Sequence, residues 1–170
     1  MLKVMENKSS DQLKDNFEYC FNLLINNSYI KAYNLFLENY LKFPAYNNYL
    51  LGVIISLILS NKIKEVKEFL KKELKISSQK KIIQLLKNFI DRNNFNINNQ
   101  RSFLFNLGLF LKQNEMFIES SLFFRICVFL EPNDKKSLLL LGEYEILKKN
   151  IEKGLALIIK SFTNIGLNRH

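Results

Sequence analysis

A leucine followed by a glycine occurs twice inside apolar, helix-like stretches of this sequence, and the two copies are 34 residues apart. The copies are Leu107-Gly108 and Leu141-Gly142. A fixed period of this length is typical of proteins built from stacked helical repeats, in which each repeat is one supersecondary unit. The spacing therefore limits the fold of the 170-residue chain more than any other feature does.

Glycines and prolines fall where such repeats need them. Glycine inside a helix costs roughly 0.5–1 kcal/mol relative to alanine, so a helical glycine needs a packing reason. Gly52, Gly108 and Gly142 occupy the same position of the repeat, where two helices are expected to cross closely. Pro44 and Pro132 follow apolar runs, at the points where one helix must stop and the next must start. Both patterns predict pairs of antiparallel helices.

The segment 102–132 shows one complete helix pair: an apolar helix, a polar turn at 112–115, a second apolar helix and a proline. This pattern resembles the tetratricopeptide repeat. The residues at the pattern's characteristic positions are Leu104, Leu107, Gly108, Leu111, Ser120, Phe124, Cys127 and Pro132. The resemblance implies an all-α binding scaffold, a right-handed α-solenoid of antiparallel helix pairs with about nine helices.

A single domain is expected over residues 1–170. No stretch alternates like a β-strand, so no strand is predicted. The expected parts are helix pairs at 13–46, 45–76, 101–134 and 135–168, an extra helix at 78–90 and an asparagine-rich loop at 91–100. The first helix is expected to start at Ser9, because Ser9 and Gln12 match a capping box.

The resemblance also implies a partner-binding groove, because in this family the first helix of each pair lines the concave surface. Carried over by register, the groove residues are Phe17, Phe21, Leu24, Tyr46, Tyr49, Val53, Ser102, Phe105, Asn106, Leu109, Lys136, Leu139 and Glu143. Most are apolar, which favours an apolar segment of a partner protein. The family's carboxylate-binding variant has a lysine and an asparagine where Phe17 and Phe21 stand here, so recognition of an acidic chain terminus is not expected.

The helix expected at 101–112 is apolar on more sides than one helix pair can bury. Beyond its intra-repeat stripe it carries Phe103, Phe105, Leu109 and Phe110. Two explanations stay open: these side chains pack against neighbouring helices, or they form a groove for an apolar partner segment.

The last expected helix ends with an apolar face formed by Leu155, Ile158, Ile159 and Phe162. Repeat arrays usually end in a polar capping helix, and here only the segment TNIGLNRH follows. An uncovered face is therefore expected, with self-association to a homo-oligomer or a partner protein as its consequence.

The net charge of +9 raises the question of an anionic partner such as nucleic acid or a membrane surface. Much of this charge lies in one lysine-rich stretch. Its lysines are Lys62, Lys64, Lys67, Lys71, Lys72, Lys75, Lys80, Lys81 and Lys87. We expect a solvated lysine face, and a functional basic patch is the alternative.

Catalytic chemistry is not expected. The only histidine, His170, is the last residue, and the sequence has no glycine-rich phosphate loop and no Cys/His cluster with metal-ligand spacing. Cys20 and Cys127 are far apart and are expected to be reduced core residues. No metal and no cofactor are predicted.

The predicted function is a non-enzymatic adaptor or chaperone that holds an apolar segment of another protein. In size and groove polarity the chain is similar to the small tetratricopeptide chaperones that keep secretion substrates soluble in bacteria. A cytoplasmic location is expected, because the N-terminus lacks a signal-peptide core and the longest apolar run, 49–59, is too short to span a bilayer. The alternatives are a nucleic-acid or membrane-surface binder acting through Lys62–Lys87, and a structural subunit of a larger assembly.

Overall fold

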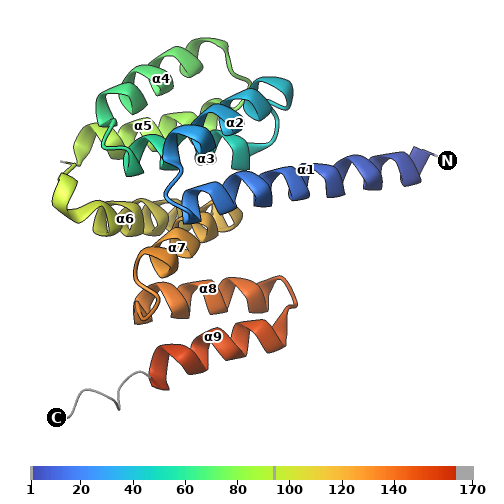
Figure 1. Ribbon diagram of the computed structural model, residues 1–170, viewed down its shortest axis with the longest axis vertical. Helices are drawn as coiled ribbons and strands as arrows, with labels where there is room; N and C mark the ends of the chain where they lie inside the picture. Colours follow the sequence, from blue (N-terminus) through green and yellow to red (C-terminus); the bar gives the residue numbers. More distant parts are fainter. Residues whose placement is uncertain (1, 94, 164–170) are drawn as a thin grey trace. The chain divides into compact units, whose positions relative to one another are not determined.

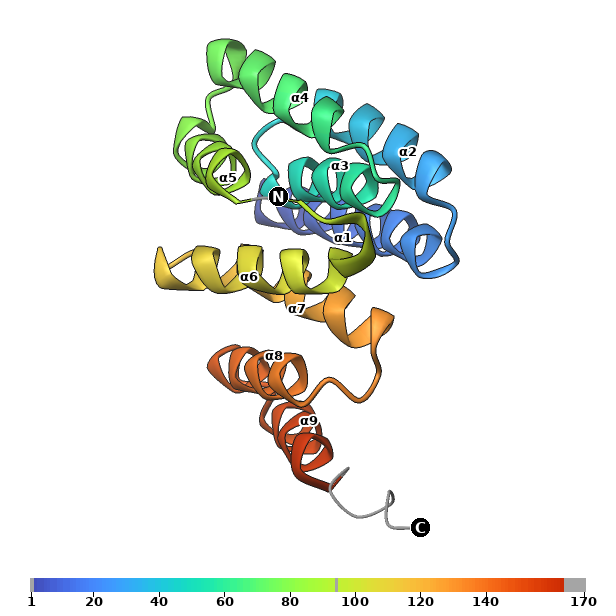
Figure 2. The ribbon, with the colours of Figure 1, turned by 90° about the vertical axis from the view of Figure 1, so that its left-hand side faces the viewer.

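The computed structural model describes residues 2–93 and 95–163, without the side chains of residues 2–10 and 97. These residues form nine α-helices and one short 3₁₀ helix, and no strand occurs among them (Figure 1, Figure 2). In chain order the elements are α1 (Leu2–Ile25), α2 (Tyr29–Lys42), α3 (Asn47–Leu59), α4 (Ile63–Ile76), α5 (Lys80–Arg92), η1 (Ile97–Asn99), α6 (Gln100–Gln113), α7 (Phe117–Leu130), α8 (Lys135–Leu147) and α9 (Ile151–Thr163). The all-α class of paired helices is confirmed.

The chain divides into two units, residues 1–87 and residues 88–170. The boundary falls inside α5, the helix expected to interrupt the repeat. In the first unit, α1 to α4 pack in chain order, and in the second unit α6 to α9 do the same. The expectation of a single domain over the whole chain stays a prediction.

The first helix begins before its expected start. Its backbone is helical from Leu2, so Ser9 and Gln12 lie inside α1 and the expected capping box is wrong. The segment before Ser9 contains no glycine and no proline, the residues that most strongly oppose a helix. Unbroken helix propensity therefore outweighs the local capping motif.

The core of the first unit is built around α3. All of its residues from Tyr49 to Leu59 are buried, because α3 contacts α1, α2 and α4. Its nearly uninterrupted apolar sequence is what a helix with neighbours on several sides requires. By contrast, α4 buries only one stripe, formed by Val66, Leu70 and Glu73, and leaves its lysines in solvent.

Four turns, two in each unit, share one backbone geometry. Their central residues lie in the left-handed region and are Asn27 (φ 56°), Asn61 (φ 61°), Glu115 (φ 63°) and Lys149 (φ 66°). In each turn the next residue donates its N–H to the carbonyl five residues earlier, as Met116 does to Leu111 at 3.0 Å. This is the Schellman arrangement of a helix C-terminus. Within each unit the two turns are 34 residues apart, so the sequence period is also a structural period.

Glycine faces glycine where α8 and α9 cross. A Cβ atom added to Gly142 would lie 2.8 Å from the carbonyl oxygen of Gly154, and a Cβ on Gly154 would lie equally close to that of Gly142. At the corresponding position in the first unit, a Cβ on Gly52 would lie 2.3 Å from the Phe36 ring. The close helix crossings expected at these glycines are confirmed.

Glu145 is a buried carboxylate on α8, only 6% exposed. It accepts hydrogen bonds from Lys153 Nζ at 2.7 Å and from Asn150 Nδ2 at 2.8 Å, and so ties α8 to the turn and to α9. Burial acts to raise the pKa of Glu145, but these hydrogen bonds and the charges of Lys153 and Lys148 outweigh it, and the pKa is lowered overall.

Gly142→Ala is expected to lower the free energy of unfolding by about 2 kcal/mol, because the new methyl group overlaps a backbone oxygen. Helix propensity alone predicts the opposite sign, a gain of about 1 kcal/mol. Chemical denaturation followed by far-UV circular dichroism measures the change, with Ala156→Gly on an exposed side of α9 as the propensity control. A more stable Gly142→Ala protein would show that the helices do not approach closely here.

Glu145→Gln is expected to cost about 2 kcal/mol at neutral pH, because two hydrogen bonds to a buried carboxylate are weakened. The lowered pKa means that this contribution is present above the ordinary value of 4.5 and is lost as the pH falls through the folded value. The gap between wild type and variant should therefore close on acidification below pH 4.5. Urea denaturation at a series of pH values measures it, and a gap independent of pH would contradict the ionised role of Glu145.

Candidate binding surface

In the second unit, a hollow opens between the end of α5 and α6. Its volume is about 290 Å³. The residues that line it are Asn88, Phe89, Arg92, Asn93, Asn106, Leu109, Phe110 and Gln113. All of them belong to residues 88–170, so the hollow is a feature of this unit alone.

Aromatic rings hold α5 and the following loop against α6. The ring centroid of Phe89 lies 5.5 Å from that of Phe103 and 5.3 Å from that of Phe110. In the loop before η1, the ring of Phe95 lies 5.2 Å from Phe103, edge to face. Such pairs contribute about 0.5–1.5 kcal/mol beyond the area they bury. The floor of the hollow is therefore a fixed aromatic cluster.

The apolar excess of α6 has both of the explanations that the sequence left open. Phe103 is buried in the aromatic cluster, and the ring of Phe105 packs 5.8 Å from that of Phe124 on α7. Leu109 and Phe110 are only half-buried, and both line the hollow. Neighbouring elements thus account for two of these side chains, and the other two remain at an open surface.

Carboxamides and one guanidinium surround this apolar floor. The carboxamides belong to Asn88, Asn93, Asn106 and Gln113. Each group can both donate and accept hydrogen bonds. Asn93 Nδ2 donates to the carbonyl of Phe89 at 2.8 Å, which fixes that amide at the end of α5. Arg92 is exposed beside the hollow, and within the described part of the chain no carboxylate pairs with it.

The other edge of α6 is joined to α8 by an ion pair. Lys112 Nζ lies 2.7 Å from Glu143 Oε2, and both side chains are partly exposed. Such a pair adds little stability, but it shows that the two helices present these residues to the same side. The predicted groove residues of this unit are all at least partly exposed: Ser102, Phe105, Asn106, Leu109, Lys136, Leu139 and Glu143.

The groove residues predicted in the first unit lie elsewhere. The structure buries in the core Phe17, Phe21, Leu24, Tyr49 and Val53. The physical reason is that α1 packs against both α2 and α3, so the ring of Phe17 contacts Phe36 at 5.7 Å and Tyr49 at 6.3 Å. Tyr46 is half-buried, with its ring 5.1 Å from that of Tyr49. These side chains stabilise the unit instead of facing a partner.

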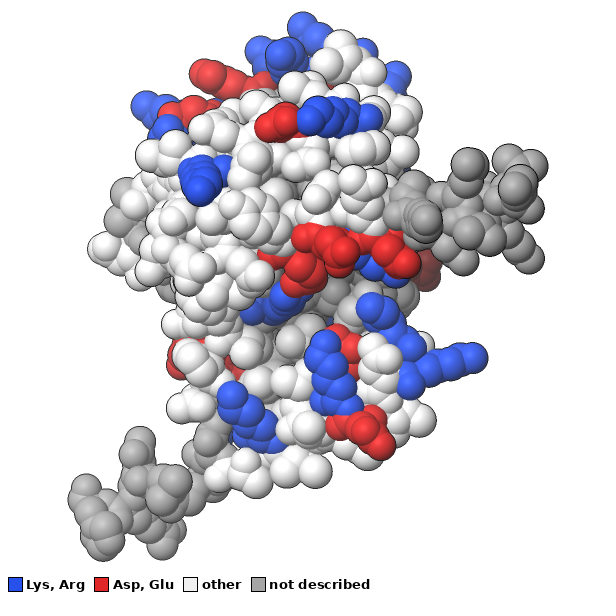
Figure 3. Space-filling model, turned by 45° about the vertical axis from the view of Figure 1, so that its right-hand side comes forward, with Lys and Arg blue, Asp and Glu red and all other residues white. Residues whose placement is uncertain are grey.

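The predicted basic residues lie on α4, on α5 and in the segments beside these helices. Lys87 is half-buried, and the exposed members are Lys62, Lys64, Lys67, Lys71, Lys72, Lys75, Lys80 and Lys81. On α4, the three- and four-residue spacing of Lys64, Lys67, Lys71 and Lys75 puts them on one side of the helix. Figure 3 shows blue side chains at the top of its view, where Figure 1 places α4.

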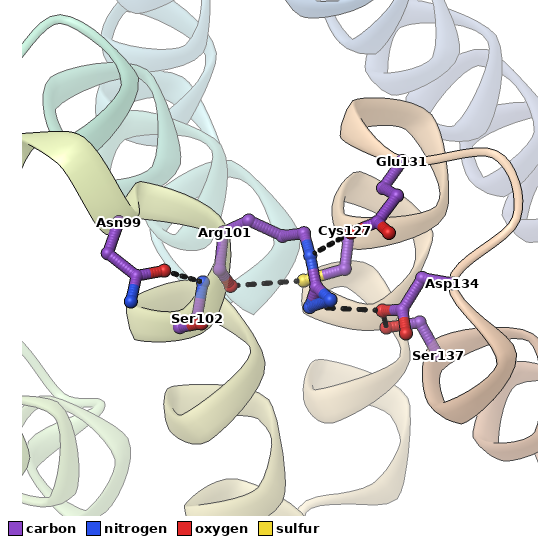
Figure 4. A network of polar contacts seen from close by, with 7 residues as sticks. All are labelled: Asn99, Arg101, Ser102, Cys127, Glu131, Asp134 and Ser137. Carbon is purple, nitrogen blue, oxygen red and sulfur yellow. Dashed lines mark hydrogen bonds and ion pairs between the residues drawn. The ribbon is translucent and has the colours of Figure 1, made fainter.

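A polar network joins α6, α7 and α8 (Figure 4). Arg101 Nε lies 2.6 Å from Glu131 Oε2, and Arg101 Nη1 lies 3.4 Å from Asp134 Oδ2. Asp134, the residue before α8, is buried and also accepts a hydrogen bond from the Ser137 hydroxyl. The thiol of Cys127 donates to the carbonyl of Arg101 at 3.6 Å. The network therefore fixes the ends of the helices that carry the surface.

Neither cysteine is a candidate nucleophile. Cys20 and Cys127 are buried and form no disulfide, as expected. Burial raises the pKa of Cys20 to about 11 and that of Cys127 to about 12, so both stay protonated at neutral pH. Over residues 2–93 and 95–163, no group of three or more His, Cys, Asp or Glu side chains could hold a metal ion.

No protein-family model matches this chain, and no curated protein matches it. Of the helices that the structure describes, none combines the length and the apolar character needed to cross a bilayer. The chemistry of the α5–α6 hollow and the α6–α8 face is therefore the basis on which a function can be argued.

Arg101→Ala is expected to lower the free energy of unfolding by about 2 kcal/mol or more, because it leaves the buried Asp134 carboxylate without its cation. The matched change Arg92→Ala removes an exposed guanidinium and should stay within about 0.5 kcal/mol of wild type. Urea denaturation of both variants measures the difference. Equal losses would contradict a structural role specific to the Arg101 network.

Proposed function

We propose that this protein is a non-enzymatic binding protein of the tetratricopeptide-repeat type that holds an extended segment of another protein. The proposed site is the α5–α6 hollow together with the adjoining α6–α8 face. The observation that carries the proposal is the composition of the hollow: an apolar floor of Phe89, Leu109 and Phe110 inside a rim of carboxamides. The 34-residue recurrence of one turn geometry supports the repeat-family assignment.

The rim favours an extended segment over a helical one. An extended peptide has main-chain N–H and C=O groups that are not paired within the segment, whereas a helix has already used most of them. A carboxamide such as that of Asn106 or Gln113 can donate to one of these groups and accept from another. Alternate side chains of the peptide would then point toward the apolar floor.

Charge narrows the chemistry of the partner segment. Arg92 stands at the edge of the hollow and is exposed. An acidic residue next to the apolar residues of the segment would supply its counter-charge. We therefore propose a segment with alternating apolar residues and at least one carboxylate. Shielding such a segment suits an adaptor or chaperone in the cytoplasm, a location that rests on the sequence alone.

A second candidate function rests on α4. Lys64, Lys67, Lys71 and Lys75 share one side of this helix and would favour a phosphate-bearing surface, either nucleic acid or an anionic membrane. Exposed glutamates, Glu65 among them, weaken the field of this side. Salt separates the two functions, because phosphate contacts weaken steeply with ionic strength and burial of apolar side chains does not.

The test is a selection of short random peptides displayed on phage against the full chain in high salt. Selected peptides should carry alternating apolar residues and a carboxylate. Fluorescence anisotropy should then show that Asn106→Ala with Leu109→Glu weakens their binding by about tenfold or more. Arg92→Ala should weaken only the peptides that carry a carboxylate.

The matched control is Leu41→Glu on α2, which makes the same leucine-to-glutamate change at a position that is 70% exposed and far along the chain. It should leave peptide affinity unchanged. Selection of no peptide, or equal affinity for wild type and the double variant, would overturn the proposal. Binding of nucleic acid or anionic vesicles that salt abolishes would move the function to α4.

A further inference from the structure

The last helix exposes a continuous apolar stripe. Its members and their exposed fractions are Ile151 (57%), Leu155 (48%), Ile159 (59%) and Phe162 (59%). Their three- and four-residue spacing puts them on one side of α9. On another side, Gly154 is buried against Gly142 of α8. The helix is thus fixed by one side while the stripe lies in solvent.

A shift of 34 residues superimposes this stripe on the surface by which α7 holds α8. Ile151 corresponds to Phe117 and Ile158 to Phe124. Both phenylalanines line, together with Leu140 of α8, a narrow gap of only about 20 Å³. Phe124 is 1% exposed, because a helix lies over it. The α9 surface is therefore the repeated form of an interface that already exists in the unit.

The side chains on α9 are more apolar than their counterparts on α7. Leu155 stands where α7 has Ser121, and Ile159 stands where it has Arg125. Ser121 is 6% exposed under α8, whereas Leu155 is about half exposed. A helix docked on α9 would thus bury more apolar area than α8 does at these positions. A surface meant for water would show the opposite trend.

The charges around the stripe are mainly positive. Lys148, Lys149 and Lys160 are exposed, and Lys153 is engaged by the buried carboxylate of Glu145. Glu152 is the one acidic residue in the sequence of α9. A ligand helix that covers the stripe therefore meets a positive border, which complements acidic residues beside its own apolar face.

We propose that α9 and the end of α8 bind one amphipathic helix of a partner protein, with acidic residues flanking its apolar face. The helix takes the position on α9 that α8 takes on α7. A second copy of this chain fits less well, because a two-fold pairing of α9 would bring its lysine-rich border toward the same border of the other copy. The site shares no residue with the α5–α6 hollow and does not depend on the proposed function.

The experiment is a selection from a displayed library of helix-forming peptides with randomised surface positions, using the full chain as target. Selected helices should have apolar residues at three- and four-residue spacing with glutamate or aspartate beside them. Leu155→Glu with Ile159→Glu should weaken their binding by about a hundredfold. The matched control, Ile30→Glu with Leu41→Glu, changes two equally exposed apolar positions on α2 and should have no effect.

Further measurements separate the alternatives. All four substituted positions are exposed, so far-UV circular dichroism should remain that of wild type. The hollow variant, Asn106→Ala with Leu109→Glu, should bind the selected helices normally. Failure to select helices, selection of lysine-flanked helices, or unchanged binding to the α9 variant would overturn the proposal. A dimer in sedimentation that the α9 changes abolish would assign the surface to a second copy instead.

Discussion

Close approach of neighbouring helices at glycine sets the position of every other element in each unit. Gly52 leaves room for the ring of Phe36, and Gly142 faces Gly154 across the crossing of α8 and α9. A fixed crossing determines which side of a helix is used for packing and which side remains outward. The α5–α6 hollow and the α9 stripe are made of sides that these crossings leave unused. Binding capacity and packing geometry therefore have one origin.

Local sequence patterns predict most of the helices. The apolar run 49–59 is a helix buried on several sides, and the glycine period places the crossings, because both signals need only neighbouring residues or a fixed spacing. The start of α1 was missed at Ser9, since a capping motif is only one local preference among several. Glu73 was counted among the acids that offset the lysines. It is buried, with the Tyr40 hydroxyl donating to its carboxylate at 2.6 Å, a partner 33 residues away that no local pattern reveals.

The binding surface could be predicted only in part. Register placed Asn106, Leu109 and Glu143 on outward sides of α6 and α8, because helices in equivalent positions of a repeat expose equivalent sides. It failed for Phe17, whose helix has neighbours on both flanks. The contribution of α5 was missed, because that helix was treated as an interruption. Its signal was present in the one-turn spacing of Asn88 and Arg92, but α6, the opposite wall of the hollow, is contributed by a separate helix beyond a loop.

The repeated turn geometry has a consequence for how this chain can change in length. Each left-handed turn lies at a fixed distance from the glycine crossing of its own helix pair, and within a unit both recur with the same period. Inserting or deleting one whole period leaves turns and crossings in phase. Any other change of length rotates the following helix by about 100° per residue and turns its apolar side away from the core. Each unit is thus quantised: it can gain or lose a helix pair, but it cannot stretch one.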